Sequence, residues 1–417
     1  MNIAVIGGGI SGLTAAHLLS EQHSVTLFEA NDYVGGHTAT KDVEIGGQSY
    51  AVDTGFIVFN DWTYPNFIKL MAKLGIDSQP SSMGFSVTTV DQSLEYCGSG
   101  LNAMFSDRKN LFNPKFLGMI RDILRFNKTA KNDLDNDRIP AGLSLLDYVR
   151  QENFGELFLR GYIFPMASAI WSSSARTVEQ FDALFFIRFF KNHGLLNIND
   201  RPQWRVVKGG SRSYVPAITQ SFKDRIHTAT PVRKIKRDDE GVFIKTDQAD
   251  HRFDKVVIAA HSDQALAMLE DPDDSESDVL SSIPYSQNSV ILHTDTGVLP
   301  RQKRAWSSWN YLIDGQEREA PVLTYNMNIL QSLDSSDTLC VTVNGDRHIA
   351  EEKVINRFTY AHPQFSVEGM RAQKEWSTIN GKRNTCYCGA YWANGFHEDG
   401  VLSGIRAAES LGAKWTL

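Results

Sequence analysis

The sequence predicts an α/β fold built on a parallel sheet, and three observations near its start support this prediction. A short apolar strand at residues 1–6 runs directly into a glycine turn at residues 7–12, and an alanine-rich helical stretch follows. A second strand at residues 25–28 then ends at Glu29. This order of strand, glycine turn, helix, strand and acid is typical of a fold that binds a dinucleotide.

Each glycine of the turn has a separate task in such a fold. Gly7 allows the tight bend, Gly9 lets the backbone approach a pyrophosphate, and Gly12 lets the helix pack against the strand. The unpaired N–H groups at the start of the helix, at Ile10 and Ser11, stabilise anionic oxygens together with the positive end of the helix dipole. The first turn is therefore predicted to hold the phosphates.

The second strand supplies a carboxylate and leads to another glycine pair. Glu29, followed by Ala30, is placed where it can accept hydrogen bonds from ribose hydroxyls. The chain continues through Gly35 and Gly36 to His37. A second glycine pair lets another loop approach the same cofactor closely, so both loops are expected to contact one molecule.

The C-terminal stretch repeats this logic. A strand meets glycine at Gly389, a short loop follows through Phe396 and residues 397–400, and a helix rich in small residues begins. Two such motifs at opposite ends of one chain are stronger evidence for a dinucleotide site than either motif alone. We therefore expect the two ends to converge in space.

These motifs together resemble the flavin amine oxidase superfamily, which includes monoamine oxidases, protoporphyrinogen oxidases and carotenoid desaturases, and within it a bacterial branch of FAD-dependent oxidoreductases. The resemblance implies a discontinuous Rossmann-like FAD-binding domain of the GR2 type with an inserted α+β substrate domain, and FAD held non-covalently. It also implies that the second helix N-terminus approaches the flavin ring. Relatives usually carry arginine after the second glycine pair, where this chain has His37.

The motifs and the resemblance predict a set of cofactor contacts spread over the chain. They are Gly7, Gly9, Ile10, Ser11, Gly12, Glu29, Ala30, Gly35, Gly36, His37, Thr54, Gly55, Phe56, Val232, Gly389, Glu398, Asp399 and Val401. Glu398 and Asp399 have an alternative role, because acidic residues at the start of a helix also cap it.

The length of 417 residues predicts two structural domains. Short β-branched strands after residue 203 and the C-terminal stretch look as if they return to the first domain. We predict an FAD-binding domain from residues 1–80, 203–284 and 381–417. The substrate domain is predicted from residues 81–202 and 285–380.

Composition limits the partners. A net charge of −7 argues against nucleic acid, which needs a basic face. The four cysteines suit a reducing compartment, and neither a disulfide framework nor a metal site is expected. Met1 leads directly into the first strand, and no apolar run reaches the length of a membrane span. We therefore expect a cytoplasmic protein that binds a small-molecule or lipid substrate; its oligomeric state stays open.

Peripheral contact with a membrane is a further expectation. Residues 113–128 form a predicted amphipathic helix that carries Lys115, Arg121, Arg125 and Lys128 among apolar residues. Such a helix can rest on anionic lipid. The alternative is an ordinary packed helix with a solvated basic face.

Three residues are candidates for catalysis. His397 lies in the loop expected beside the flavin, and histidine titrates near neutral pH; its alternative role is to hold that loop by hydrogen bonds. Phe396 is expected to flank the substrate cavity. His293 ends a strand at residues 288–293 that is comparable to the strand bearing the flavin-facing lysine of the amine oxidases, and no lysine is present there. Packing and hydrogen bonding are the alternative role of His293.

The sequence analysis predicts an FAD-dependent oxidoreductase that abstracts a hydride from an apolar, lipid or fatty-acyl substrate, in the manner of a desaturase. The Phe-rich segment at residues 181–190 supports an apolar substrate if it lines a tunnel, although a core helix explains the same pattern. Two alternatives stay open: a small-amine oxidase, and a flavin-binding protein without turnover.

Overall fold

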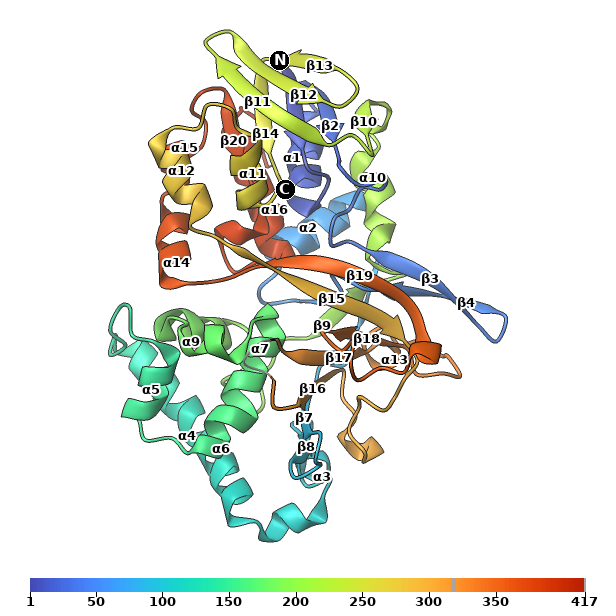
Figure 1. Cartoon of the computed structure of the whole chain (residues 1–417), viewed down its shortest axis with the longest axis vertical. Coiled ribbons are helices and arrows are strands. Elements are labelled where there is room, and N and C mark those ends of the chain that lie inside the picture. The colour runs from blue at the N-terminus through green and yellow to red at the C-terminus, as the bar shows by residue number, and fades with distance from the viewer. Residues whose placement is uncertain (317–319, 416–417) are drawn as a thin grey trace.

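A five-stranded parallel sheet forms the centre of the upper half of the molecule in Figure 1, a computed structural model that describes residues 1–316 and 320–415. Its strand order is β10-β2-β1-β14-β20, and every neighbouring pair is parallel. The strands come from three distant parts of the chain: β1 (Asn2–Ile6), β2 (Ser24–Phe28), β10 (Ile226–His227), β14 (Lys255–Ile258) and β20 (Thr385–Tyr387). The predicted α/β fold with a parallel sheet is confirmed.

Both faces of this sheet are covered, as a parallel sheet requires. Ile3 and Val5 point to one face, where helices α1 (Ile10–Leu19) and α16 (His397–Glu409) pack. Ala4 and Ile6 point to the other face, against a three-stranded antiparallel sheet. The strands of that sheet are β11 (Val232–Asp238), β12 (Gly241–Thr246) and β13 (Asp250–Phe253).

The remaining elements of the upper half surround this core. They are the strands β3 (Thr40–Ile45), β4 (Gln48–Asp53), β5 (Phe59–Asn60), β6 (Ser78–Pro80) and β9 (Trp204–Val207), the α-helices α2 (Pro65–Leu74), α10 (Val215–Thr219), α11 (Ser262–Met268), α12 (Asp274–Ser281), α14 (Val367–Lys374) and α15 (Trp376–Ile379), and the short helices η3 (Ser211–Tyr214), η4 (Lys223–Arg225) and η7 (Ala390–Trp392).

A seven-stranded sheet organises the lower half, in the order β19-β15-β18-β17-β16-β7-β8. All its pairs are antiparallel except β16 with β7. Its strands are β7 (Phe85–Thr89), β8 (Glu95–Cys97), β15 (Tyr285–His293), β16 (Trp309–Ile313), β17 (Val322–Asn326), β18 (Cys340–Val343) and β19 (Val354–Pro363). Figure 1 shows β15 and β19 running along the junction between the two halves.

Helices between the strands complete the lower half. They are α3 (Leu101–Met104), α4 (Pro114–Asp135), α5 (Leu145–Gln151), α6 (Glu156–Phe158), α7 (Phe164–Trp171), α8 (Ala175–Glu179), α9 (Ala183–Asn192) and α13 (Met327–Leu330), with the short helices η1 (Arg108–Phe112), η2 (Leu159–Ile163), η5 (Lys303–Ala305) and η6 (Glu351–Lys353). The inner faces of the helices from α4 to α9 form one aromatic-rich core. Within residues 1–316 and 320–415, no helix combines the length and hydrophobicity needed to cross a bilayer.

Strand pairing supports two domains, which we propose with one changed boundary. The parallel sheet draws only on the ranges predicted for the FAD-binding domain, and the seven-stranded sheet only on those predicted for the substrate domain. However, α14 and α15 lie in the predicted substrate range and pack against α12 and β20 of the upper half. Trp376 Nε1 donates to the carbonyl of Tyr387, 2.9 Å away. We therefore propose a boundary near residue 365 instead of 380.

Candidate functional site

The first glycine turn is shaped for a ligand at one position and for packing at the other two. Gly7 has φ +104°, and an added Cβ there would lie 2.7 Å from the carbonyl oxygen of Ala259. At Gly12 it would lie 2.0 Å from the carbonyl oxygen of Gly7. At Gly9 it would meet nothing within 4 Å, and no side chain caps α1. The start of α1, at Ile10 and Ser11, thus offers N–H groups beside open space, as a phosphate site requires.

The second glycine loop lies against the first. The N–H of Gly35 donates to the carbonyl of Gly8 (2.8 Å), and a Cβ on Gly36 would come within 3.1 Å of Gly9 Cα. The loop after β4 joins them, because the N–H of Phe56 donates to the carbonyl of His37 (2.7 Å). A Cβ on neighbouring Gly55 would lie 2.2 Å from the same oxygen. Residues far apart in sequence therefore form one continuous backbone surface.

Glu29 is buried at the end of β2 with its carboxylate directed at the first turn. Its Oε2 accepts from the N–H of Gly8 (2.7 Å), and its Oε1 accepts from the backbone and side chain of Asn31 (both 2.9 Å). Ala30 follows it. Val232 lies nearby at the start of β11, packed in the cluster that contains Phe28. The predicted ribose carboxylate is thus held beside the phosphate turn.

The C-terminal motif reaches the same place through close helix packing. Gly389 follows β20, and its N–H donates to Ser403 Oγ (3.0 Å). A Cβ on Gly400 would lie 2.7 Å from Ile10 Cγ2, so the first turns of α1 and α16 are in contact. The positive ends of two helix dipoles therefore meet at one edge of the sheet. The structure brings together the two ends that the sequence analysis predicted to converge.

The acidic residues that open α16 act as caps on two helices. Asp399 Oδ2 accepts from the N–H of Phe396 (2.9 Å), which caps α16 itself. Glu398 accepts from the N–H groups of Asn66 (3.0 Å) and Phe67 (2.8 Å), so it caps the start of α2. Burial raises the pKa of Asp399 to about 7. Val401 is fully buried in the apolar cluster around α1, which leaves only its backbone for a cofactor.

The side chain of His397 points into the upper half. Its ring stacks on Phe56 at 3.5 Å, and its Nε2 lies 2.9 Å from the hydroxyl of Tyr214 and 3.2 Å from Thr38 Oγ1. Burial lowers the pKa of His397 well below its usual value. This placement favours the loop-holding role over proton transfer.

His37 and His362 form a pair of neighbouring histidines at the junction between the two halves, beside the glycine loops. His37 is buried within 5.6 Å of the His362 ring, and burial lowers its pKa to about 3. Among the described residues its Nε2 has no hydrogen-bond partner. The Nδ2 of Asn288 donates to Nδ1 of His362 (2.9 Å), and Asn344 donates to the Oδ1 of Asn288 (2.8 Å). The ring proton of neutral His362 therefore resides on Nε2.

The strand face that carries His362 also contacts the predicted cofactor loop. Tyr360 and His362 are two residues apart on β19 and share one face, opposite Asn288 and Ser286 of β15. The hydroxyl of Tyr360 lies 2.9 Å from Oγ1 of Thr54. Sequence reasoning did not single out His362 or Tyr360. The sequence signal that could have identified them is the alternation of Phe358, Tyr360 and His362, which places three ring side chains on one face of a strand.

An aromatic wall adjoins the start of α16. The ring of Phe396 stacks on Phe189 of α9 at 5.3 Å, and Phe189 lies 4.7 Å from Trp171. Phe185 of α9 stacks on Phe365 at 5.9 Å, and a Cβ on Gly395 would lie 3.0 Å from the Phe365 ring. The Phe-rich segment is therefore a packed helix, and its outermost rings reach Phe396 and Phe365 beside the start of α16.

His293 lies apart from these groups. It is the last residue of β15, where it is paired with Cys340 of β18. Its Nε2 donates to Thr342 Oγ1 (2.7 Å), and its Nδ1 accepts from the N–H of Asp295 (3.0 Å). Burial lowers its pKa to about 4. The structure does not bring His293 together with the other candidates, and its bonding is that of a structural residue.

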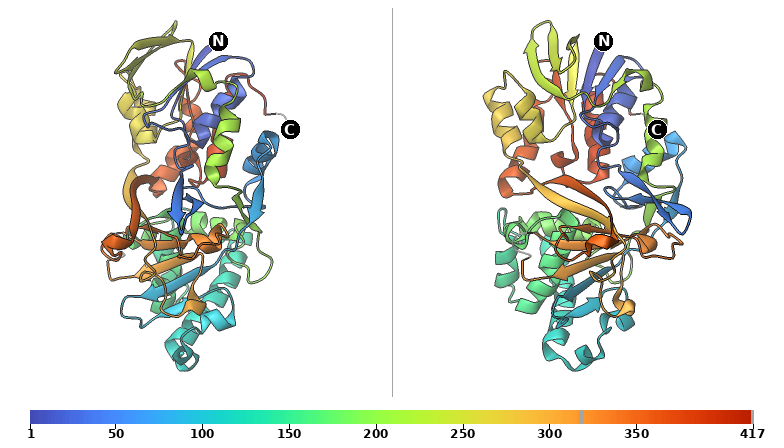
Figure 2. Two further views of the ribbon diagram at one scale, coloured as in Figure 1. Left: turned by 90° about the vertical axis from the view of Figure 1, so that its right-hand side faces the viewer. Right: turned by 45° about the vertical axis from the view of Figure 1, so that its right-hand side comes forward.

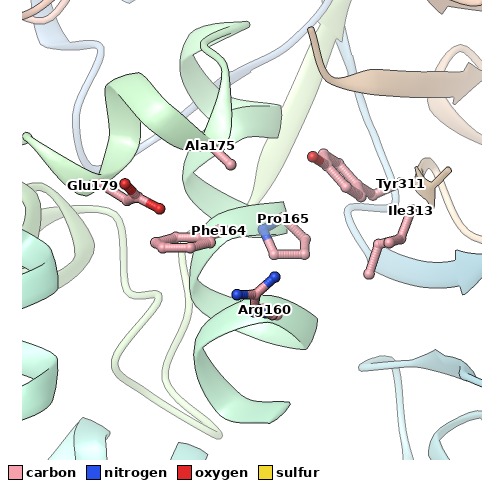
Figure 3. A pocket seen from close by; sticks show the side chains of 7 residues that line it. All are labelled: Arg160, Phe164, Pro165, Ala175, Glu179, Tyr311 and Ile313. Carbon is pink, nitrogen blue, oxygen red and sulfur yellow. The ribbon is translucent and has the colours of Figure 1, made fainter. Parts of the chain in front are cut away.

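A small cavity in the lower half lies outside this site. Figure 3 shows its lining, formed by Phe164, Pro165, Ala175, Tyr311 and Ile313 with Arg160 and Glu179. Its volume of about 30 Å³ has room for water but not for an organic substrate. Among the residues that the structure describes, no group of three or more His, Cys, Asp or Glu side chains could hold a metal ion.

Comparisons with known proteins agree with this geometry. Residues 10–359 match the model of the family described as flavin containing amine oxidoreductase. A carotenoid phi-ring synthase of Streptomyces griseus is 26% identical over 62% of this chain and 52% of its own length. A horse flavin-containing amine oxidase A is 26% identical over 62% of this chain and 49% of its own length. The chain thus spans about half the length of these curated relatives.

Solved structures share the whole fold. Cyclohexylamine oxidase from Brevibacterium oxydans IH-35A superposes with a TM-score of 0.68 at 18% identity, over 98% of both chains. A fatty acid isomerase from P. acnes, described as producing CLA, gives a TM-score of 0.69 at 17% identity over 96% of both chains. At such identities the likeness concerns the fold alone.

Proposed function

Since the chain belongs to the family of flavin-containing amine oxidoreductases, and so is an FAD-dependent oxidoreductase, we propose that its substrate is apolar, a lipid or fatty-acyl chain from which a hydride is removed. The observation that carries this proposal is the aromatic wall beside the start of α16. The rings of Trp171, Phe185, Phe189, Phe365 and Phe396 pack on one another beside the start of α16, where we expect the substrate to meet the cofactor. Such a wall gains more from burying an acyl chain than from a hydrated cation.

The residues present fit FAD. The starts of α1 and α16, with their unpaired N–H groups, would hold anionic and polar edges of the cofactor, and Glu29 would hold the ribose. His37, with its unpaired Nε2, would meet the pyrophosphate where relatives carry arginine. FAD, when bound, would supply the redox chemistry by accepting a hydride, which carries two electrons. We propose non-covalent binding.

The polar face of β15 and β19 would orient groups at the junction. Asn288 stands on the strand where amine oxidases carry lysine, and it holds His362 with Nε2–H directed away from the pair. Because burial lowers the pKa of His362 to about 4, the ring is neutral near pH 7 and acts as a hydrogen-bond donor. We propose that this pair positions polar atoms beside the substrate while the aromatic wall excludes water.

The experiment that tests the substrate class is anaerobic reduction of the bound flavin. The purified holoenzyme is mixed with phospholipids that carry unsaturated acyl chains, with free fatty acids, or with short alkyl amines, and loss of the flavin absorbance is followed. Reduction by an acyl substrate supports the proposal. Reduction by an amine alone would overturn it.

A small-amine oxidase is the second candidate function. The observation that favours it is the pair of rings, Phe365 and Phe396, that border Gly395, because an aromatic pair can flank an amine. The same experiment separates it from the first candidate. A flavin that no donor of either class reduces would instead support the third alternative, a flavin-binding protein without turnover.

A further inference from the structure

The lower end of the molecule exposes a group of large apolar side chains. Phe112 is 88% exposed and Leu101 is 80% exposed, more than any other large apolar residue in the described part of the chain. Leu111, Leu117 and Leu124 are exposed as well. These residues belong to α3, η1 and the first half of α4. Figures 1 and 2 show this cyan segment at the tip opposite the N-terminus; we call residues 101–128 the tip segment.

Helix α4 divides into an inner and an outer face. Its inner face buries Phe116, Met119, Phe126 and Ala130 in the aromatic core. Its outer face carries Leu117, Arg121, Leu124 and Lys128, at spacings of four, three and four residues that form one stripe along the helix. The inner face is sufficient to hold the helix, so the outer stripe is free to meet a partner.

Cations are interleaved with the exposed apolar side chains. Arg108, Lys109, Lys115, Arg121 and Lys128 are exposed, and within residues 1–316 and 320–415 none of them forms an ion pair with a carboxylate. The tip segment holds six basic and two acidic residues, a net charge of +4, on a chain whose net charge is −7. The positive charge is therefore concentrated at one end.

Arg125 does not belong to this surface. Its guanidinium donates to the carbonyls of Glu152 and Asn153, and it lies 3.9 Å from the centre of the Phe154 ring. Of the four basic residues that suggested a lipid-facing helix in the sequence, Arg121 and Lys128 lie on the outer face, Lys115 is exposed in the first turn of α4, and Arg125 is structural. Ile198, 67% exposed, extends the apolar surface across a groove from Leu124 and Lys128.

We propose that the tip segment docks on an anionic bilayer surface, with Phe112 and Leu101 among the acyl chains and the five cations at the headgroup phosphates. Apolar side chains that protrude between cations fit a lipid interface, because each kind of group meets its own layer there. A second copy of this surface would oppose positive charge with positive charge. The proposal goes beyond the proposed function and does not depend on which substrate the flavin site takes.

The test is co-sedimentation of the flavin-loaded protein with vesicles. Vesicles of phosphatidylcholine with phosphatidylglycerol should bind the protein, and vesicles of phosphatidylcholine alone should bind it about tenfold or more weakly. High salt should weaken binding to the anionic vesicles, because exposed charges are screened. Binding is measured without substrate, so its failure and the failure of the proposed function are distinct results.

Two sets of variants locate the surface. Leu101→Ser with Phe112→Ser should weaken binding about tenfold or more, since two large apolar side chains are removed from the membrane. Lys115→Ser, Arg121→Ser and Lys128→Ser should each weaken it about fivefold. The matched controls are Phe243→Ser and Lys245→Ser, exposed residues of β12 at the opposite end of the molecule, which should leave binding unchanged.

The outcomes are separable. Flavin absorbance and melting temperature should stay unchanged in the tip variants, because their side chains are exposed. Equal binding to neutral and anionic vesicles, or equal loss in the tip and β12 variants, would overturn the proposal. So would a lack of vesicle binding together with a dimer in sedimentation velocity that the Leu101→Ser, Phe112→Ser variant dissociates, because that result would identify a second copy as the partner.

Discussion

Gly404 of α16 lies directly against Ser11 of α1, where an added Cβ would come within 2.4 Å of the Ser11 carbonyl oxygen. This contact fixes the distance between the two helices whose first turns converge on the candidate site. We predict that Gly404→Ala lowers the free energy of unfolding by about 1–3 kcal/mol, because backbone atoms must move apart, and that FAD is retained less well. Urea unfolding and the ratio of flavin to protein absorbance measure both effects.

Gly118→Ala is the matched control for this change. Gly118 lies inside α4, and an added Cβ would meet nothing within 4 Å. That variant should raise the free energy of unfolding by about 0.5–1 kcal/mol, since alanine favours a helix, and should leave FAD content unchanged. Equal effects of the two substitutions would contradict the role given to the α1–α16 contact.

The affinity for FAD should depend on pH through His37. Burial, with His362 and His261 nearby, lowers the pKa of His37 to about 3 in the protein without cofactor. A pyrophosphate beside Nε2 would raise that pKa, so binding takes up a proton, and affinity falls as pH rises through the pKa of the bound state. Fluorescence titration of the apoprotein with FAD across neutral pH measures this trend.

Two His37 variants separate this explanation from others. His37→Arg should bind FAD with less dependence on pH, because its charge is permanent. His37→Ala should bind more weakly at every pH, also with less dependence. If His37→Ala keeps the pH trend of the parent protein, another group is responsible for it.

Asn288 is expected to position His362 for the reaction. Asn288→Asp places a carboxylate beside His362 Nδ1, and this negative charge raises the pKa of that histidine from about 4. The pH profile of flavin reduction should therefore move to higher pH. Asn288→Leu should slow reduction about tenfold or more without loss of FAD.

Asn310→Leu provides the comparison for Asn288. Asn310 is buried and bonded to Ser86 on a strand pair away from the junction. Its loss should lower the free energy of unfolding by about 1–3 kcal/mol while the rate of reduction per bound flavin stays the same. A rate loss as large as that of Asn288→Leu would show that both residues act only through stability.

The aromatic wall should determine which substrates enter. Phe365→Ala and Phe396→Ala remove rings that lie beside the start of α16. We expect each to raise KM for an acyl substrate about tenfold, with a smaller change in kcat, because apolar contact with the substrate is lost. Steady-state kinetics over chain length measure this. An unchanged KM for every chain length would exclude these rings from the substrate cavity.

His293 should matter for stability and not for chemistry. Its pKa is lowered to about 4, so it contributes stability that is present above about pH 6.5 and is lost as pH falls toward 4. His293→Gln should unfold with less dependence on pH over this interval, while reduction per bound flavin stays within about twofold of the parent. A loss of reduction with unchanged stability would restore His293 as a catalytic candidate.

Parts of the site could be predicted because local sequence specifies them. Gly7, Gly9 and Gly12 follow a strand and open a helix, and this order is visible without knowledge of distant contacts. The histidines show the limit of such reasoning. His397 was expected in the loop before the last helix, whereas α16 begins at His397 itself. The direction of its ring depends on Phe56 and Tyr214, which pack from other parts of the chain. His362 was missed because its partner, Asn288, lies 74 positions away.

Sequence alone determined the strand, turn and helix order at both ends, since apolar periodicity and glycine positions act within a few residues. Only the tertiary structure decided that α14 and α15 join the upper half, that Glu398 caps α2, and that the exposed side chains of residues 101–128 gather at one tip. The reason is physical: hydrogen bonds, burial and charge depend on which distant residues fill the space around a side chain, and that is settled when the elements pack.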